Sequence, residues 1–133
     1  MTQYVDSSAL LAVLLDEPTA DRVGALLAAD PDWITGRHTF VEVRRNLVRL
    51  LAPGDLDPAR EIFGRYWARS TVIELDAVTC DLAAELAEIT GVRTLDALHL
   101  AAARRVSPTD VPVLTLDVRL RDAARMLGMA APE

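Results

Sequence analysis

The chain has 133 residues, and its 20 acidic side chains outnumber 14 basic ones, which gives a formal net charge of −6 at pH 7. All of the basic side chains are arginines. This length fits one domain, residues 1–133, and a content of 51% hydrophobic and 26% charged residues argues against disorder. An acidic chain does not attract nucleic acid by its overall charge, so such a partner would require metal ions or a local arginine patch.

Membrane and disulfide-stabilised classes of protein are disfavoured. The N-terminus lacks the basic and apolar segments of a secretory signal, and the longest uncharged apolar run, 7–15, is too short to cross a bilayer. Cys80 is the single cysteine, and we expect it to be a small core residue in a reducing compartment. The two histidines and this cysteine are too far apart in the sequence for a zinc motif. These features predict a cytoplasmic protein.

In chain order, the hydrophobic pattern predicts strands that alternate with helices. The predicted strands are 3–5, 33–35, 71–75 and 111–116. The predicted helices are 9–15, 18–29, 37–51, 57–69, 78–90, 94–105 and 118–127. Local signals set several limits: Ser7 and Ser8 can cap the first helix, Gly36 breaks the second strand, and Pro53-Gly54 ends the third helix.

This alternation is typical of a parallel sheet that is covered by helices on both faces. We therefore predict an α/β/α sandwich with a sheet of four or five parallel strands. In such sheets, functional groups lie beyond the carboxyl ends of the strands. Asp6 follows the first predicted strand, and Asp117 follows the last one. Each of these residues also fits a simpler role, in which its carboxylate accepts backbone N–H groups at the start of the next helix.

Two further acids stand within predicted helices. Glu42 lies three residues before Arg45, and a solvated Glu–Arg face is the simpler interpretation of this pair. Asp96 lies in a helix that is apolar on nearly all sides, with Thr94 and His99 as its polar neighbours. A buried carboxylate is costly unless it is paired or binds metal, although Asp96 could also favour the first turn of the helix through the helix dipole.

Together, these four acids suit a divalent metal site. Mg²⁺ and Mn²⁺ prefer carboxylate oxygens, with water and substrate phosphate completing the coordination. Gathered carboxylates repel one another when no cation is present. Bound metal ions can activate water and neutralise charge during attack at phosphorus.

Four stretches carry a family resemblance in their order along the chain. They are 5–10 (VDSSAL), 40–45 (FVEVRR), 93–101 (RTLDALHLA) and 114–120 (LTLDVRL). The ordered set, which spans nearly the whole chain, resembles the PIN-domain ribonucleases, and most closely the VapC-type toxins of type II (VapBC) toxin–antitoxin pairs. The resemblance implies a PIN-like fold and an endoribonuclease that hydrolyses RNA phosphodiester bonds with a metal-activated water.

The resemblance also implies roles for individual residues. It assigns Asp6, Glu42, Asp96 and Asp117 to a catalytic site for Mg²⁺, in which Mn²⁺ would substitute. Ser8 would position Asp6, and Thr115 corresponds to the polar residue two positions before the last acid. Arg45 and Arg93 could contact RNA phosphate or pair with nearby acids. For His99, we expect a buried histidine that bonds to a neighbouring carbonyl or carboxylate.

The implied partners are an RNA substrate and a cognate VapB-type antitoxin whose tail would occupy the groove near the acids. A homodimer, which could form a hetero-oligomer with the antitoxin, is also expected. The predicted helices 18–29 and 57–69 are candidate contact surfaces, with core packing as the simpler role.

Other functions fit the residues less well. A haloacid-dehalogenase-like phosphatase would have a second Asp at the position of Ser8, and a receiver domain would need a lysine. A serine hydrolase would need a G-x-S-x-G turn, which the sequence lacks. A PIN-like module that only binds a partner protein remains an alternative, and it should tolerate Asp96→Asn, whereas a nuclease should not.

Overall fold

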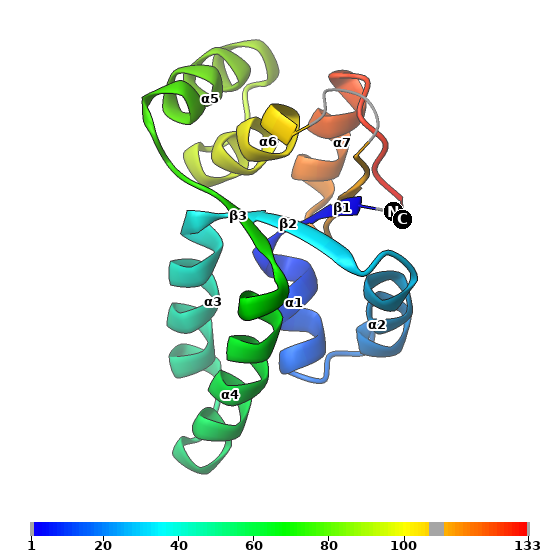
Figure 1. Cartoon of the computed structure of the whole chain (residues 1–133), viewed down its shortest axis with the longest axis vertical. Coiled ribbons are helices and arrows are strands. Elements are labelled where there is room, and N and C mark those ends of the chain that lie inside the picture. The colour runs from blue at the N-terminus through cyan, green and yellow to red at the C-terminus, as the bar shows by residue number, and fades with distance from the viewer. Residues whose placement is uncertain (1, 107–110, 133) are drawn as a thin grey trace.

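The computed structural model describes residues 2–106 and 111–132 as strands that alternate with helices (Figure 1). The strands are β1 (Thr2–Val5), β2 (Asp32–Gly36), β3 (Thr71–Ile73) and β4 (Val113–Leu114). The helices are α1 (Ser7–Leu14), α2 (Ala20–Ala29), α3 (Arg37–Leu50), α4 (Pro53–Arg69), α5 (Ala77–Thr90), α6 (Thr94–Val106) and α7 (Val118–Met126). None of the helices in this described part of the chain is long and apolar enough to span a membrane.

The four strands form one sheet in the order β3-β2-β1-β4, and every neighbouring pair is parallel. This confirms the predicted parallel sheet, with the smaller of the two expected strand numbers. The chain moves outward from β1 through β2 to β3 and then returns to place β4 on the other side of β1. The switch in strand order therefore lies between β1 and β4, where ligands bind in sheets of this kind.

Helices cover both faces of the sheet (Figure 1). Because successive side chains of a strand point to opposite faces, neighbouring strand residues enter different cores. Tyr4, Ile34 and Val113 pack in the core shared with α5, α6 and α7. Val5 and Leu114 enter the second core, which is formed with α1 to α4. Both faces are thus apolar, and the polar chemistry is left to the ends of the strands.

Several predicted limits were wrong. Gly36 does not break β2 but ends it, because it pairs with Ile73 of β3. The helix predicted to begin at residue 57 begins at Pro53, where a proline is tolerated because the first turn of a helix needs no N–H donor. The cap of α1 is Asp6 rather than either serine.

Cys80 was also placed wrongly by the sequence. It is exposed on α5, and its Sγ lies 3.7 Å from the carbonyl oxygen of Leu75. The buried positions of α5 are instead taken by Thr79, Ala83 and Leu86. A lone cysteine on an amphipathic helix resembles a core residue by composition alone, but the helical phase puts this one on the outer side.

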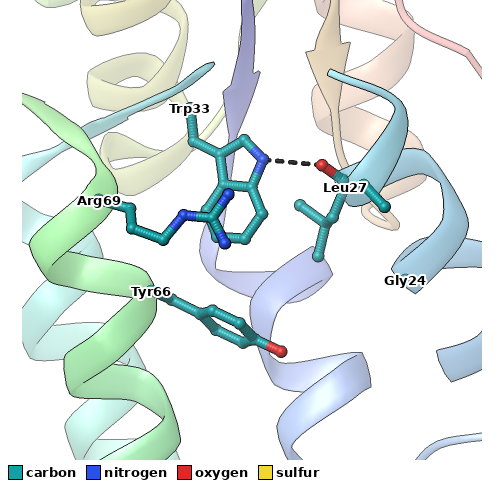
Figure 2. Close-up of a pocket in the computed structure, with 6 residues that line it drawn as sticks. Gly24, Leu27, Trp33, Tyr66 and Arg69 are labelled. Atoms are coloured by element: carbon teal, nitrogen blue, oxygen red, sulfur yellow. Dashed lines mark hydrogen bonds between the residues drawn. The ribbon is translucent and has the colours of Figure 1, made fainter. Parts of the chain in front are cut away.

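A pocket of about 300 Å³ lies between α2, α4 and the start of β2 (Figure 2). The indole N–H of Trp33 donates to the carbonyl oxygen of Leu27 at 2.9 Å, and the Arg69 guanidinium lies 4.8 Å from the Trp33 ring centroid. The ring of Tyr66 packs edge-on against the same indole. No carboxylate lines this pocket among the described residues, and it lies at the end of β2 opposite to Gly36. It is therefore separate from the predicted acidic site.

Candidate active site at the carboxyl edge of the sheet

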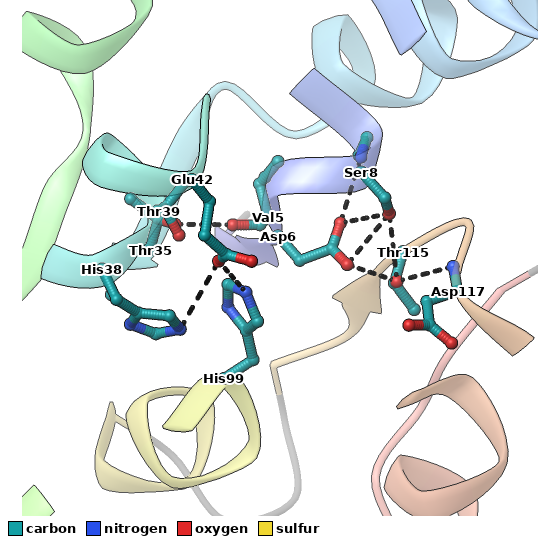
Figure 3. Close-up of polar contacts among 12 residues, drawn as sticks. Val5, Asp6, Ser8, Thr35, His38, Thr39, Glu42, His99, Thr115 and Asp117 are labelled. Carbon is teal, nitrogen blue, oxygen red and sulfur yellow. Dashed lines mark hydrogen bonds and ion pairs between the residues drawn. The ribbon is translucent and has the colours of Figure 1, made fainter. Parts of the chain in front are cut away.

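Asp6 sits directly after β1 and is held by three donor groups that make four hydrogen bonds (Figure 3). The Ser8 hydroxyl donates to Oδ1 at 2.7 Å, and the Thr115 hydroxyl donates to Oδ2 at 2.5 Å. The backbone N–H of Ala9 completes the cap of α1 by donating to Oδ1 at 3.0 Å. Asp6 therefore has the capping role that the sequence offered as the simpler interpretation, and it lies at the carboxyl end of β1 as predicted.

The carboxylate of Asp6 is almost fully buried, with 3% of the residue exposed. Burial raises its pKa, although the His99 charge and the hydrogen bonds from Thr115 and Ser8 act in the opposite direction. A raised pKa means that the surroundings of the buried carboxylate do not supply enough positive charge to stabilise its ionised form. A cation bound next to Asp6 would supply that charge.

Asp117 lies in the turn after β4, next to the β1–α1 turn. Its backbone N–H donates to the Thr115 hydroxyl at 3.0 Å, and its Oδ1 caps α7 by accepting from the backbone N–H of Arg119 at 2.9 Å. The N–H of Leu116 donates to the Ser8 hydroxyl at 2.9 Å. Thr115 and Ser8 therefore join the two turns and fix Asp117 relative to Asp6, as Figure 3 shows.

Asp96 lies in the first turn of α6 and faces a pocket of about 610 Å³. The pocket is lined by Glu42, Val92, Arg93, Thr94, Leu95, Asp96 and Asp117. Burial raises the pKa of the Asp96 carboxyl, and the charge of Asp117 raises it further. The charge of Asp6 acts on Asp96 in the same direction. Three of the four predicted acids thus share one pocket, and the fourth lies near enough for its charge to act on Asp96.

Glu42 reaches this pocket from α3, but its carboxylate is held by histidine (Figure 3). Its Oε1 lies 2.8 Å from Nε2 of His99 and 3.9 Å from Nε2 of His38. Burial acts to raise the pKa of Glu42, yet the hydrogen bond and charge of His99 outweigh it and bring this pKa below its usual value. The simpler interpretation of a solvated Glu–Arg face does not describe Glu42, because its side chain is only 20% exposed.

His99 is buried between Glu42 and Tyr4. Its Nδ1 lies 2.6 Å from the Tyr4 hydroxyl, and that hydroxyl also accepts from the backbone N–H of Gly36 at 3.1 Å. Burial and the charge of Asp6 raise the pKa of Tyr4, so the phenol stays protonated. A hydrogen-bonded chain from Tyr4 through His99 to Glu42 therefore runs across the carboxyl edge of the sheet.

His38 and Tyr4 were not identified from the sequence as parts of this region. His38 lies four residues before Glu42, and this spacing places both side chains on one face of α3. Its ring centroid is 4.1 Å from that of His99, and burial together with the His99 charge lowers the pKa of His38 to about 3. The imidazole of His38 is consequently neutral near pH 7.

Gly36 is needed for this arrangement. A Cβ at position 36 would lie 2.5 Å from Cε1 of His38 and 2.6 Å from its Nδ1. The His38 ring cannot move away easily, because it packs against His99.

Gly36→Ala is expected to lower the free energy of unfolding by about 1–3 kcal/mol, the usual cost of overpacking a buried site. Urea denaturation would measure this loss. Gly24→Ala is the matched control, because a Cβ there meets nothing within 4 Å and alanine favours the α2 helix. Equal stability of the two variants would contradict the expected clash.

The two arginines singled out in the sequence differ in position. Arg93 is exposed and lines the acidic pocket, and its charge lowers the pKa of Asp96 against the larger effect of burial. Arg45 is exposed on α3, one turn after Glu42. Arg93 is therefore the one that the structure brings to the acids.

Sequence comparison identifies the family. Residues 3–126 match the family model described as the PIN domain. The chain belongs to the PIN domain family. The parallel sheet between two helical layers is the PIN-like fold that the sequence motifs implied.

Individual PIN proteins are similar over nearly the whole chain. Ribonuclease VapC46 of Mycobacterium tuberculosis is 35% identical over 127 residues, which are 96% of this chain and 93% of that protein. The structure of FitAcB from Neisseria gonorrhoeae aligns with a TM-score of 0.75 and 21% identity, covering 100% of this chain and 97% of that one. A toxin–antitoxin complex from Klebsiella pneumoniae gives a TM-score of 0.73 at 18% identity, with 98% of both chains covered. At such low identities, the two structures support the fold alone.

Proposed function

We propose that this PIN domain is a metal-dependent endoribonuclease of the VapC type, which acts as a toxin and is neutralised by a cognate antitoxin. The observation that carries the proposal is the convergence of Glu42, Asp96 and Asp117 on one pocket, beside the buried carboxylate of Asp6. The similarity to Ribonuclease VapC46 over 96% of the chain supports RNA as the substrate.

In this proposal, Asp6, Asp96 and Asp117 hold Mg²⁺ directly, and Mn²⁺ can take its place. Glu42 completes the site directly or through water. The donor set fits a hard divalent cation, because it consists of carboxylates whose charges raise the pKa of Asp96 when no cation is present.

A bound Mg²⁺ would activate water and neutralise charge at the scissile phosphate. The protein's own residues contribute orientation and charge. Ser8 and Thr115 fix the Asp6 carboxylate through their hydroxyl donors, and His99 holds Glu42 at the pocket wall. Arg93 and Arg45 are the candidates for contact with RNA phosphates, and Arg93 is the nearer of the two to the acids because it lines their pocket.

The proposed protein partner is a VapB-type antitoxin. A pocket lined by three carboxylates suits a positively charged antitoxin side chain, which would compete with metal for the same oxygens. A homodimer that binds antitoxin into a hetero-oligomer is the assembly that we propose for the cell.

Metal removal is the first test of this function. Antitoxin-free protein incubated with total cellular RNA should release discrete fragments in Mg²⁺ or Mn²⁺ and none in EDTA, because the acids cannot supply the activating charge themselves. Electrophoresis of the RNA would show the fragments, and Asp96→Asn should remove them. Absence of cleavage by folded protein in Mg²⁺ and Mn²⁺ would favour the alternative of a PIN module that only binds a partner.

A further inference from the structure

Both histidines of the chain lie at one place, next to Glu42. The sequence argued against a zinc motif because His38 and His99 are far apart along the chain. In the fold, however, α3 and α6 bring the two imidazoles and the Glu42 carboxylate together (Figure 3). One ligand atom from each of the three residues can be chosen so that all lie within 4.8 Å of one another.

The spacing of these atoms is close to that of a metal site. Two ligand atoms that are each about 2.0–2.1 Å from a tetrahedral Zn²⁺ lie roughly 3.3–3.4 Å apart. The two observed separations from Glu42 Oε1, 2.8 Å to His99 Nε2 and 3.9 Å to His38 Nε2, fall on either side of this value. Both separations therefore differ from the tetrahedral value by only about 0.5–0.6 Å.

The surroundings of the two histidines also suit a metal ion. His38 is 6% exposed, and neither of its ring nitrogens makes a short, well-aligned hydrogen bond among the described residues. Its Nε2 lies 3.9 Å from Glu42 Oε1, and a contact with the Leu95 backbone raises its pKa only in part against the larger effect of burial. An ion at Nε2 of His99 would place the ring proton on Nδ1. This N–H could then donate a hydrogen bond to the Tyr4 oxygen, which lies 2.6 Å away. Such an outer partner is typical of metal-binding histidines.

We propose that His38, Glu42 and His99 form a binding site for a first-row transition-metal ion such as Zn²⁺, which shares only Glu42 with the proposed Mg²⁺ site of the aspartates. Imidazole nitrogen favours ions of this class, whereas Mg²⁺ favours oxygen ligands. Glu42 lines the acidic pocket, so one ligand of the proposed site is reached from that pocket. Three protein ligands leave a further coordination position open.

The two histidines make a direct test possible in the unmodified protein. Their imidazole proton NMR signals report only on His38 and His99, provided that any histidine tag has been removed. Zn²⁺ should shift both sets of signals until one equivalent has been added, whereas Mg²⁺ should leave the His38 signals in place. A Zn²⁺ titration that moves neither ring, or His99 alone, would overturn the three-ligand site.

Variants separate this site from the proposed nuclease site. We expect His38→Gln and His99→Gln to weaken Zn²⁺ binding at least about 10-fold in calorimetry, while Asp117→Asn keeps the affinity of the parent protein. Circular dichroism would confirm that the variants are folded. If the histidines only hold Glu42 in place, His38→Gln will bind Zn²⁺ as tightly as the parent, and the proposal is wrong. RNA cleavage plays no part in these readouts, so a failure of the nuclease proposal would be seen separately.

Discussion

Asp6→Asn is expected to abolish metal-dependent RNA cleavage while leaving the protein folded. Asparagine keeps the size of the side chain, and its Oδ1 can still accept the Ala9 N–H that caps α1. Its amide nitrogen, however, would place N–H donors against the Thr115 hydroxyl, which donates to Oδ2 of the aspartate in the parent protein. The substitution also removes the buried negative charge. Mutation of a residue that only hydrogen-bonds to a metal ligand typically lowers metal affinity or activity 10–100-fold. We therefore expect the substitution of a ligand itself to lower the cleavage rate at least about 100-fold.

Initial rates of RNA cleavage in Mg²⁺ would measure this loss. Asp32→Asn provides the control, since Asp32 is exposed at the start of β2, at the opposite end of that strand from the site. It removes the same charge from the same residue type. Cleavage by Asp6→Asn at the rate of the Asp32 control would remove Asp6 from the catalytic machinery.

The sequence was sufficient to place Asp6 and Asp117 near each other because the argument depends on topology alone. Parallel strands present their carboxyl ends at one edge of the sheet, and each residue directly follows a strand predicted from the sequence. In the structure, Asp6 directly follows β1, and Asp117 comes three residues after the end of β4. The structure adds the reason for their fixed separation, which is the pair of hydroxyls from Ser8 and Thr115 that links the two turns. These links connect residues more than 100 positions apart, so no local pattern could reveal their geometry.

The surroundings of Glu42 could not be derived in the same way. Helical spacing shows which residues share a face of α3, and it identifies His38 and Arg45 equally well as neighbours of Glu42. Which of them is buried depends on how α3 meets α6, and this is a tertiary contact. The expectation that His99 is a buried histidine bonded to a carboxylate agrees with its observed contact, but the identity of that carboxylate came only from the fold.

A second large effect is expected for Asp117→Asn, whose influence on stability should change sign with metal. In EDTA, the variant should be more stable than the parent by several tenths to about 1 kcal/mol, because the charge that raises the pKa of Asp96 is gone. Asparagine caps helices as well as aspartate does, so the cap of α7 should persist. The stabilisation is thus a direct measure of the repulsion between the site's carboxylates.

In Mg²⁺ the order should reverse. At a Mg²⁺ concentration of 100 times the Kd, binding stabilises the parent by about 2.7 kcal/mol. If Asp117→Asn weakens binding 10- to 100-fold, the variant gains only about 0.4–1.4 kcal/mol at the same concentration. Thermal unfolding of both proteins in EDTA and in Mg²⁺ would test the reversal, with Asp122→Asn on the exposed side of α7 as the control for removal of one charge. A variant that stays more stable than the parent in both conditions would show that Asp117 does not bind the metal.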